Sequence, residues 1–335
     1  MRRVTFNIPL FFLLVILLVP RGSAIALPDE SVSPEQQPAD KFTVQKKLMS
    51  TLNSATRPTK FYSVPTARIP RTMEVVLTGG SSYGEKEGGG TRGAVGLGLG
   101  GVAELELSST QVANQLTGRN SRFPAKTFKV YLIPEQLAKL PLMPHLAIQL
   151  RTADWGKAID AGDRIREGLL QSYADANQGY NLQSLGLQTR FTTLYAIAGF
   201  EGKLGGVYGG LSLTDVRTRG GTQAVLNNGT GLMEYKTFPP MQKNILEPFG
   251  GLLINANPTT QMLAEVSAIP SLDYDVRKKG LLIETAWCGI AGIRFFMLPW
   301  LSLDTGVRYL STFEGIADSD INLAVNAVIP LKPGR

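Results

Sequence analysis

Hydrophobic and polar residues alternate with a period of two along most of the chain beyond residue 71. In the stretch LSLDTGVRYL, one face carries Leu301, Leu303, Thr305, Val307 and Tyr309, and the other carries Ser302, Asp304, Gly306 and Arg308. The stretches HLAIQLR and INLAVNAVI separate their residues in the same way. Because successive side chains of a β-strand point to opposite faces, the pattern predicts strands with one apolar and one polar face.

We predict twelve strands from this alternation. They are expected at 72–83, 92–99, 102–112, 125–133, 144–153, 185–199, 203–216, 246–256, 260–268, 280–295, 300–311 and 320–331. The connections after the even-numbered strands are mostly tight (GG, PEQLAKLPLM, EGK, ANPTT and MLPW), whereas 154–184 and 217–245 are long. Bacterial outer-membrane barrels have short turns at one end, long loops at the other and an even number of strands.

The fold class that these patterns predict is all-β. We expect a closed antiparallel transmembrane β-barrel of about 12 strands, with 10 to 14 allowed, preceded by a polar N-terminal extension. A bilayer leaves no water to pair with the backbone, so strands that cross it must close into a barrel. Aromatic residues gather near the ends of the expected strands, where headgroup-level side chains belong; they are Trp287, Phe295, Phe296, Trp300 and Tyr309.

A glycine-rich stretch, GAVGLGLGGVAELELSS, contains Gly96, Gly98 and Gly101 in the G-x-G-x-x-G order of a dinucleotide-binding turn. That motif needs a helix after it, and here the alternation of strands resumes instead. We therefore interpret the stretch as a hairpin that turns at Gly100-Gly101, since glycine enters positive φ without steric cost. Gly96, Gly98 and Gly100 are expected to face the inside of a narrow barrel, where a small residue leaves room for other groups.

The N-terminal region divides into two parts. Two arginines, an apolar run from Ile8 to Val19 and the small residues Ala24-Ile25-Ala26 predict a cleaved signal peptide over 1–26. Residues 27–70 are polar and proline-rich, and we interpret them as a periplasmic extension, either a solvated arm or a plug that enters the barrel mouth. The barrel would then cover 71–335, in the outer membrane of a diderm bacterium.

Composition and charge limit the classes of molecule that the protein is expected to bind. Cys288 is the only cysteine, so an internal disulfide cannot form. The formal net charge of +7 includes three arginines in 1–26, which leaves +4 for the rest, and basic residues are scattered. Nucleic acid is therefore a poor candidate. The expected partners are outer-membrane lipid and lipopolysaccharide, the barrel assembly machinery and, as a hypothesis, a polysaccharide.

Charged and polar residues on the inner faces of the expected strands are the candidate site. We expect the lumen to be lined by Glu104, Glu106, Lys129, Gln149, Arg151, Arg190, Glu265, Glu284, Arg294, Asp304 and Arg308, with Asn322 and Asn326 beside them. Both signs of charge are present. Two interpretations remain open: a lumen held together by ion pairs and hydrogen bonds, or a lining that selects solutes by charge.

We predict no enzymatic activity, no catalytic residue, no metal site and no cofactor. His145 is the only histidine, and no serine lies at a spacing that would pair with it. One histidine and one cysteine cannot build a zinc site without several carboxylates at suitable spacing. The sequon Asn228-Gly229-Thr230 indicates only an exposed loop.

Several segments resemble a known family. The stretches VPTARIPRTMEVVL, FKVYLIPEQLAKLPLMPHLAIQLR, FTTLYAIAGFEGKLGGVYGGLSL and PWLSLDTGVRYL are similar to segments of the YjbH-like outer-membrane barrels associated with exopolysaccharide production. The resemblance spans most of 64–331 and implies an outer-membrane barrel with a role at the cell surface. Two departures stand out: the chain ends in VIPLKPGR rather than in an aromatic residue, and family members are usually larger.

These observations lead to three hypotheses. The first is a barrel with a structural or transport role at the cell surface, linked to exopolysaccharide export. The second is a general porin for small solutes. The third is an outer-membrane lipid-modifying enzyme.

Overall fold

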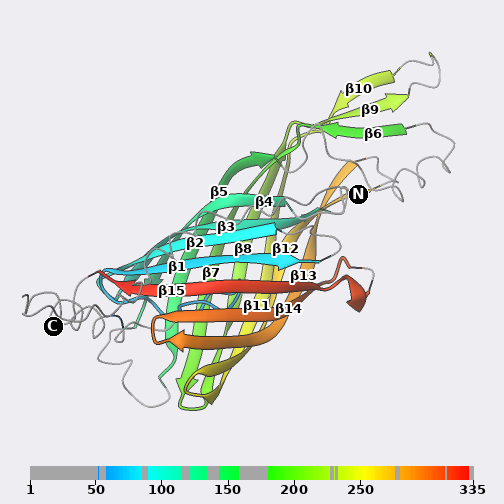
Figure 1. Ribbon diagram of the computed structural model, residues 1–335. Coiled ribbons are helices and arrows are strands. Elements are labelled where there is room, and N and C mark those ends of the chain that lie inside the picture. Colours follow the sequence, from blue (N-terminus) through cyan, green and yellow to red (C-terminus); the bar gives the residue numbers. More distant parts are fainter. Residues whose placement is uncertain are drawn as a thin grey trace, which may run out of the picture. The chain divides into compact units, whose positions relative to one another are not determined.

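Twelve antiparallel strands form a closed barrel, as the alternation predicts (Figure 1). The computed structural model describes residues 52, 58–84, 90–114, 121–133, 143–157, 180–226, 230, 233–275, 280–313 and 315–331. The barrel strands are β1 (Glu74–Tyr83), β2 (Gly90–Leu99), β3 (Ala103–Asn114), β4 (Ser121–Tyr131), β5 (His145–Lys157), β7 (Gln188–Gly202), β8 (Gly205–Arg219), β11 (Met241–Asn257), β12 (Thr260–Asp275), β13 (Gly280–Leu298), β14 (Leu301–Leu310) and β15 (Asp320–Pro330). All twelve expected strands are confirmed. The expected signal peptide and most of the extension lie outside the described residues.

The first and last strands close the barrel. β1 pairs with β15 in a continuous register from Glu74↔Pro330 to Tyr83↔Ile321, so the wall has no open edge between them. The short 3-10 helix η1 (Ile316–Asp318) precedes β15. In the described part of the chain, no helix is long and apolar enough to cross a membrane.

The connections of two or three residues that join β2 to β3, β7 to β8, β11 to β12 and β13 to β14 all lie at one end of the barrel. We call this the turn end and the opposite end the loop end. Gly100 and Gly101 take φ values of 65° and 69° in the β2–β3 turn, in agreement with the expected glycine hairpin. Gly96 and Gly98 are buried on the inner face. Gly100 is exposed in the turn instead, so its expected inward position was wrong. A residue in the turn itself lies outside the alternation of the strands.

The two long connections carry a second, smaller sheet at the loop end. Its strands are β6 (Tyr180–Leu185), β9 (Thr222–Leu226) and β10 (Met233–Thr237), in the order β10-β9-β6. Gly220 and Gly221, with φ values of 68° and 81°, allow the chain to turn from β8 into β9. The intervals 158–179, 227–229 and 231–232, which include the first two residues of the sequon, lie outside the described residues.

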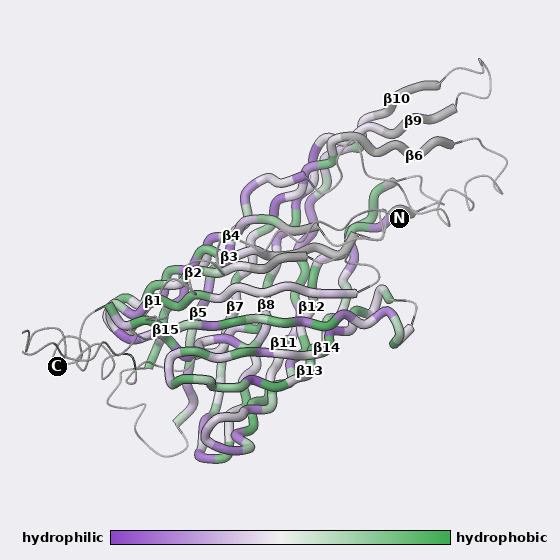
Figure 2. Tube along the Cα trace, in the orientation of Figure 1, coloured by the Kyte–Doolittle hydropathy of each residue, from purple (hydrophilic) through white to green (hydrophobic). Residues whose placement is uncertain are grey.

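The outer face of the barrel wall is apolar. Figure 2 shows hydrophobic and hydrophilic residues alternating along the barrel strands. Large apolar side chains exposed on this face include Val95, Leu105, Leu107, Phe128, Ile148, Leu150, Leu194, Val207, Leu211, Leu213, Leu252, Ile254, Met262, Val266, Phe295, Val307, Ile321 and Leu323. Such a continuous exposed apolar surface is far larger than the patches that soluble proteins carry.

The barrel departs from a simple cylinder at β12 and β13. The β11–β12 ladder ends at Gly250↔Val266, although β11 continues along β8 to Met241. Beyond that level β12 pairs with β13 and makes a short parallel contact with β3, at Ser271↔Ala113 and Leu272↔Asn114. We call the strand ends 267–275 and 280–287 the inner hairpin, because they leave the wall and cross the interior.

Burial supports this crossing. Leu281 and Ile283 lie on the face of β13 opposite to that of the buried Cys288 and Ile290, and yet they are buried as well. They pack in an apolar cluster with Phe123, Ala125, Ala153, Leu187, Phe191, Val216, Phe238, Ile245 and Leu272. Apolar residues from β4, β5, β7, β8 and β11 therefore meet the inner hairpin and fill the loop half of that side of the barrel.

Candidate functional site: a plugged lumen

Residues 58–70, which we call the plug, fold back on themselves inside the lumen. The Thr66 amide and hydroxyl both donate to the Thr59 carbonyl, at 3.4 and 2.5 Å. The Phe61 amide donates to the Val64 carbonyl at 3.2 Å, so 61–64 form a tight turn at the tip. The described end of the expected polar extension therefore lies among buried side chains of the barrel rather than in solvent.

A single carboxylate holds the tip of the plug. Glu265, on β12, accepts hydrogen bonds from the amides of Tyr62 at 3.0 Å, Ser63 at 3.0 Å and Val64 at 3.1 Å. The Ser63 hydroxyl adds a fourth, at 2.6 Å. Consecutive backbone N–H groups that converge on one anion form a strong charge-assisted cradle. The plug backbone, rather than a basic side chain, thus compensates the buried charge of Glu265.

An arginine of the wall binds a backbone carbonyl of the same segment. Arg294, on β13, forms a two-point ion pair with Asp304 on β14 at 2.7 and 2.8 Å. Its Nη2 also donates to the carbonyl of Lys60 at 3.2 Å. Both side chains are buried, and a pair that is fully desolvated needs such additional partners. The plug amides therefore meet a negative charge on β12, and a plug carbonyl meets a positive charge on the adjacent strand β13.

The plug side chains fit into notches in the wall. Phe61 packs edge-on against Tyr208 with ring centroids 5.7 Å apart, and a Cβ added at Gly251 would lie 2.5 Å from the Phe61 ring. The Tyr62 hydroxyl donates to the Thr305 carbonyl at 2.6 Å and occupies the space beside Gly292. Burial raises the pKa of the Tyr62 hydroxyl, so this group is a neutral donor.

Phe61, Val64 and Ala67 share an apolar cluster with the wall residues Ala147, Ile197, Tyr208, Phe249, Leu253 and Leu263. The plug is therefore held by apolar packing as well as by the polar contacts of its backbone.

The remaining plug contacts lie near the turn end. Thr59 donates to Glu104 at 3.3 Å, and Lys129 pairs with the same carboxylate at 2.5 Å. Lys60 forms an ion pair with Glu106. Closer still to the turn end, Arg68 pairs with Glu201 at the end of β7 through two contacts of 2.5 and 3.0 Å.

A cavity of about 160 Å³ remains between the plug tip and the inner hairpin. Its walls include Thr78 from β1, Arg151 from β5, Tyr195 from β7 and Phe249 from β11. The hairpin contributes 267–270, and β15 contributes Asn322 and Asn326. The described residues thus form a chamber with the plug on one side and the inner hairpin on the other.

Most residues expected to line the lumen lie on the inner face. Glu104, Glu106, Lys129, Gln149, Glu265, Arg294, Asp304, Arg308, Asn322 and Asn326 are buried, and Arg151 is partly buried. They are distributed over ion pairs, plug contacts and the chamber. Arg308, for example, pairs with Asp320 at the start of β15, away from the plug.

Two of the expected positions were wrong. Arg190 is exposed because the inward residues of β7 are its neighbours Thr189 and Phe191, and a step of one residue changes the face. Glu284 is exposed because, at this end of β13, its neighbours Leu281 and Ile283 on the opposite face are the buried residues.

The plug residues Phe61, Tyr62 and Ser63 are functional candidates that the sequence did not single out. Their only sequence signals are the small residues opposite them, Gly251, Gly292 and Gly306, which sit in strands that are otherwise apolar or charged.

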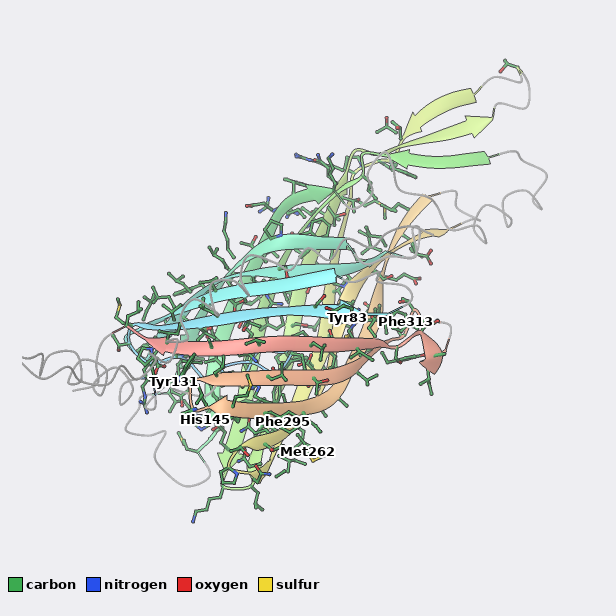
Figure 3. The ribbon with its side chains drawn as sticks, viewed as in Figure 1. Tyr83, Tyr131, His145, Met262, Phe295 and Phe313 are labelled. Carbon is green, nitrogen blue, oxygen red and sulfur yellow. The ribbon has the colours of Figure 1, made fainter. Side chains whose placement is uncertain are left out.

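His145 lies at the turn end beside Tyr131 (Figure 3). Its Nδ1 is 2.8 Å from the Tyr131 hydroxyl, an arrangement that supplies no activated serine or cysteine nucleophile. In the part of the chain that is described, no group of three or more His, Cys, Asp or Glu side chains could hold a metal ion.

Comparison with known proteins finds no matching family model and no matching curated protein. Among solved structures, the chain is similar to the NanC porin, with 11% identity, a TM-score of 0.39 and coverage of 77% of this chain and 100% of that one. It is also similar to the translocator domain of the autotransporter NalP from Neisseria meningitidis, with 11% identity, a TM-score of 0.41 and coverage of 86% and 95%. The Ralstonia pickettii toluene transporter TbuX gives 7% identity, a TM-score of 0.34 and coverage of 78% and 90%. At TM-scores below 0.5, these similarities give no basis for assigning a substrate to this chain.

Proposed function

We propose that the protein is an outer-membrane barrel whose own N-terminal plug gates the passage of a small solute. The observation that carries this proposal is the polar cradle between the plug tip and two charged groups of the wall, Glu265 and Arg294. A segment attached by hydrogen bonds and ion pairs can exchange them for water when it leaves, at a low net cost for each bond.

The apolar outer face supports a membrane location. Its exposed leucines, isoleucines, valines and phenylalanines alternate with buried polar residues on the same strands, which suits lipid outside and a polar lumen inside. With a signal peptide expected over 1–26, the outer membrane of a diderm bacterium is the compartment that matches.

Strand number supports a gated lumen rather than a solid core. Eight-stranded barrels are filled by side chains alone, and barrels of sixteen or more strands leave an aqueous channel. Twelve strands lie between these limits, so the lumen has room that side chains do not fill. Here the plug and the inner hairpin occupy that room, which argues against a permanently open general porin.

Single-channel recording in planar bilayers tests the proposal. Wild-type protein is expected to be closed for most of the recording, and Glu265→Gln is expected to open frequently because the amide cannot accept all four hydrogen bonds at the tip. Glu284→Gln is the matched control, since it neutralises an exposed carboxylate that does not contact the plug. Steady conductance in the wild type would favour a general porin. Silence in every variant would favour a structural role.

The link to exopolysaccharide export stays a finer proposal, supported by the resemblance of 64–331 to the YjbH-like barrels. Deletion of the gene is expected to reduce the polysaccharide released to the cell surface, and expression of the wild-type chain is expected to restore it. If a chain that carries Glu265→Gln also restores release, then export requires the barrel but not the hold of Glu265 on the plug. An unchanged polysaccharide in the deletion strain would remove the link.

A further inference from the structure

The chamber between the plug and the inner hairpin has the size of one small ring compound. Its volume of about 160 Å³ is close to that of an engineered apolar cavity of about 150 Å³ that binds benzene. Unlike that cavity, this one has a polar lining. Hydroxyl groups reach it from several sides of the barrel, from Thr78, Thr193, Ser212, Thr214 and Ser267.

Two side-chain nitrogens in the lining lack an acceptor within the described residues. The Nδ2 of Asn322 and the Nε of Arg151 are buried without a hydrogen-bond partner. Asn322 is 3% exposed, and its Oδ1 already accepts a hydrogen bond from Ser82. A buried donor without an acceptor is costly, so a ligand that supplies acceptors at both places would be favoured.

The charged groups around the chamber carry one more positive charge than they can neutralise among themselves. Lys60 pairs with Glu106, and Asp304 pairs with Arg294. Glu265 is satisfied by the four donors at the plug tip. Arg151 interacts electrostatically with the same Glu106, so that Lys60 and Arg151 share a single carboxylate. The Nη1 of Arg151 donates to the Tyr195 hydroxyl at 3.4 Å. An arginine in this state favours a carboxylate, which it can bind through two parallel hydrogen bonds.

Aromatic rings complete the lining. Tyr195 and Phe249 are in edge-to-face contact with centroids 5.5 Å apart, and both border the chamber together with Phe191. The Arg151 guanidinium lies 5.4 Å from the centroid of the Tyr195 ring. Rings of this kind offer an apolar surface to the C–H groups of a compact ligand, while the hydroxyls around them bind its polar edge.

We propose that this chamber binds a polyhydroxylated ring compound that carries one carboxylate, the size of a single sugar-acid unit. Arg151 binds the carboxylate, Asn322 donates to a ring or hydroxyl oxygen, and Tyr195 with Phe249 packs against the carbon framework. The proposal deepens the gated-transport function, on which it rests for the route of the ligand, although binding itself does not require the plug to open.

Equilibrium binding to the full-length protein in detergent micelles tests the proposal, with D-glucuronate and D-glucose as the two probes. Wild-type protein is expected to bind glucuronate at least about tenfold more tightly than glucose, because only glucuronate carries the charge for Arg151. Arg151→Gln is expected to remove this preference. Arg190→Gln, which removes an exposed arginine from the neighbouring strand, is expected to leave it unchanged.

The possible outcomes are separable. Equal affinity for the two sugars in the wild type, or no binding of either, overturns the proposal without any variant, even if Arg151→Gln fails to assemble. A glucuronate preference that survives in an assembled Arg151→Gln barrel overturns the role of Arg151. Because these measurements do not depend on conductance, a silent barrel that still prefers glucuronate would reject the gate and retain the binding site.

Discussion

Removal of the Glu265 carboxylate should release the plug tip. In Glu265→Ala the amides of Tyr62, Ser63 and Val64 lose their acceptor while they remain buried in the docked plug. At about 1 kcal/mol for each unpaired buried donor, the docked state loses about 3 kcal/mol relative to an undocked state in which water accepts these bonds. The loss corresponds to a shift of about a hundredfold in the docking equilibrium.

Amide hydrogen exchange measures that shift at the atoms concerned. In assembled barrels, the exchange protection of 62–64 is expected to fall by about a hundredfold in Glu265→Ala, since exchange of a buried amide reports the opening equilibrium. Protection of the β1–β15 ladder should not change. Glu284→Ala supplies the control. If 62–64 keep their protection in Glu265→Ala within a factor of three, the carboxylate does not hold the plug and the reasoning is wrong.

Three further predictions follow from the wall and its contacts. Leu303→Ile should assemble normally and Leu303→Arg should not, because arginine facing the bilayer midplane costs about 2–4 kcal/mol. The measurement is the assembled fraction in the membrane, read as a heat-dependent shift in gel migration. Gly251→Val should increase the open fraction in planar bilayers, because its side chain would take the space of the Phe61 ring, and unchanged gating would contradict the notch. Arg308→Met should lower the free energy of unfolding in urea by about 3–5 kcal/mol, because the Asp320 carboxylate stays buried without the positive charge of Arg308. Adding Asp320→Leu should recover much of this loss.

Period-two alternation was enough to predict the twelve strands, because lipid and lumen impose opposite polarities on neighbouring residues. The inner hairpin could not be predicted in this way. Leu281 and Ile283 continue the alternation of β13 without a break, and only the end of the β11–β12 ladder at Val266 reveals that their face has turned into the interior.

The candidate site was predictable only in part. Inward charges such as Glu265 and Arg294 follow from the alternation, but their partners are backbone groups of the plug about two hundred residues away in the chain. Backbone amides and carbonyls carry no sequence signal, so the polar, proline-rich residues 27–70 were compatible with a solvated arm as well as with a plug. The matching small residues in the wall, Gly251 and Gly292, gain meaning only once the plug side chains lie against them.

The path of the plug bears on how the protein can be assembled. Thr59 and Thr66 are hydrogen-bonded to each other, and Thr59 contacts Glu104 near the turn end, so the segment forms a finger with its two ends side by side. A finger of this kind can enter a finished barrel through one mouth, without any chain end being threaded through the wall. Closure of β1 against β15 and docking of the plug are therefore separable steps, and an empty barrel can precede the filled one.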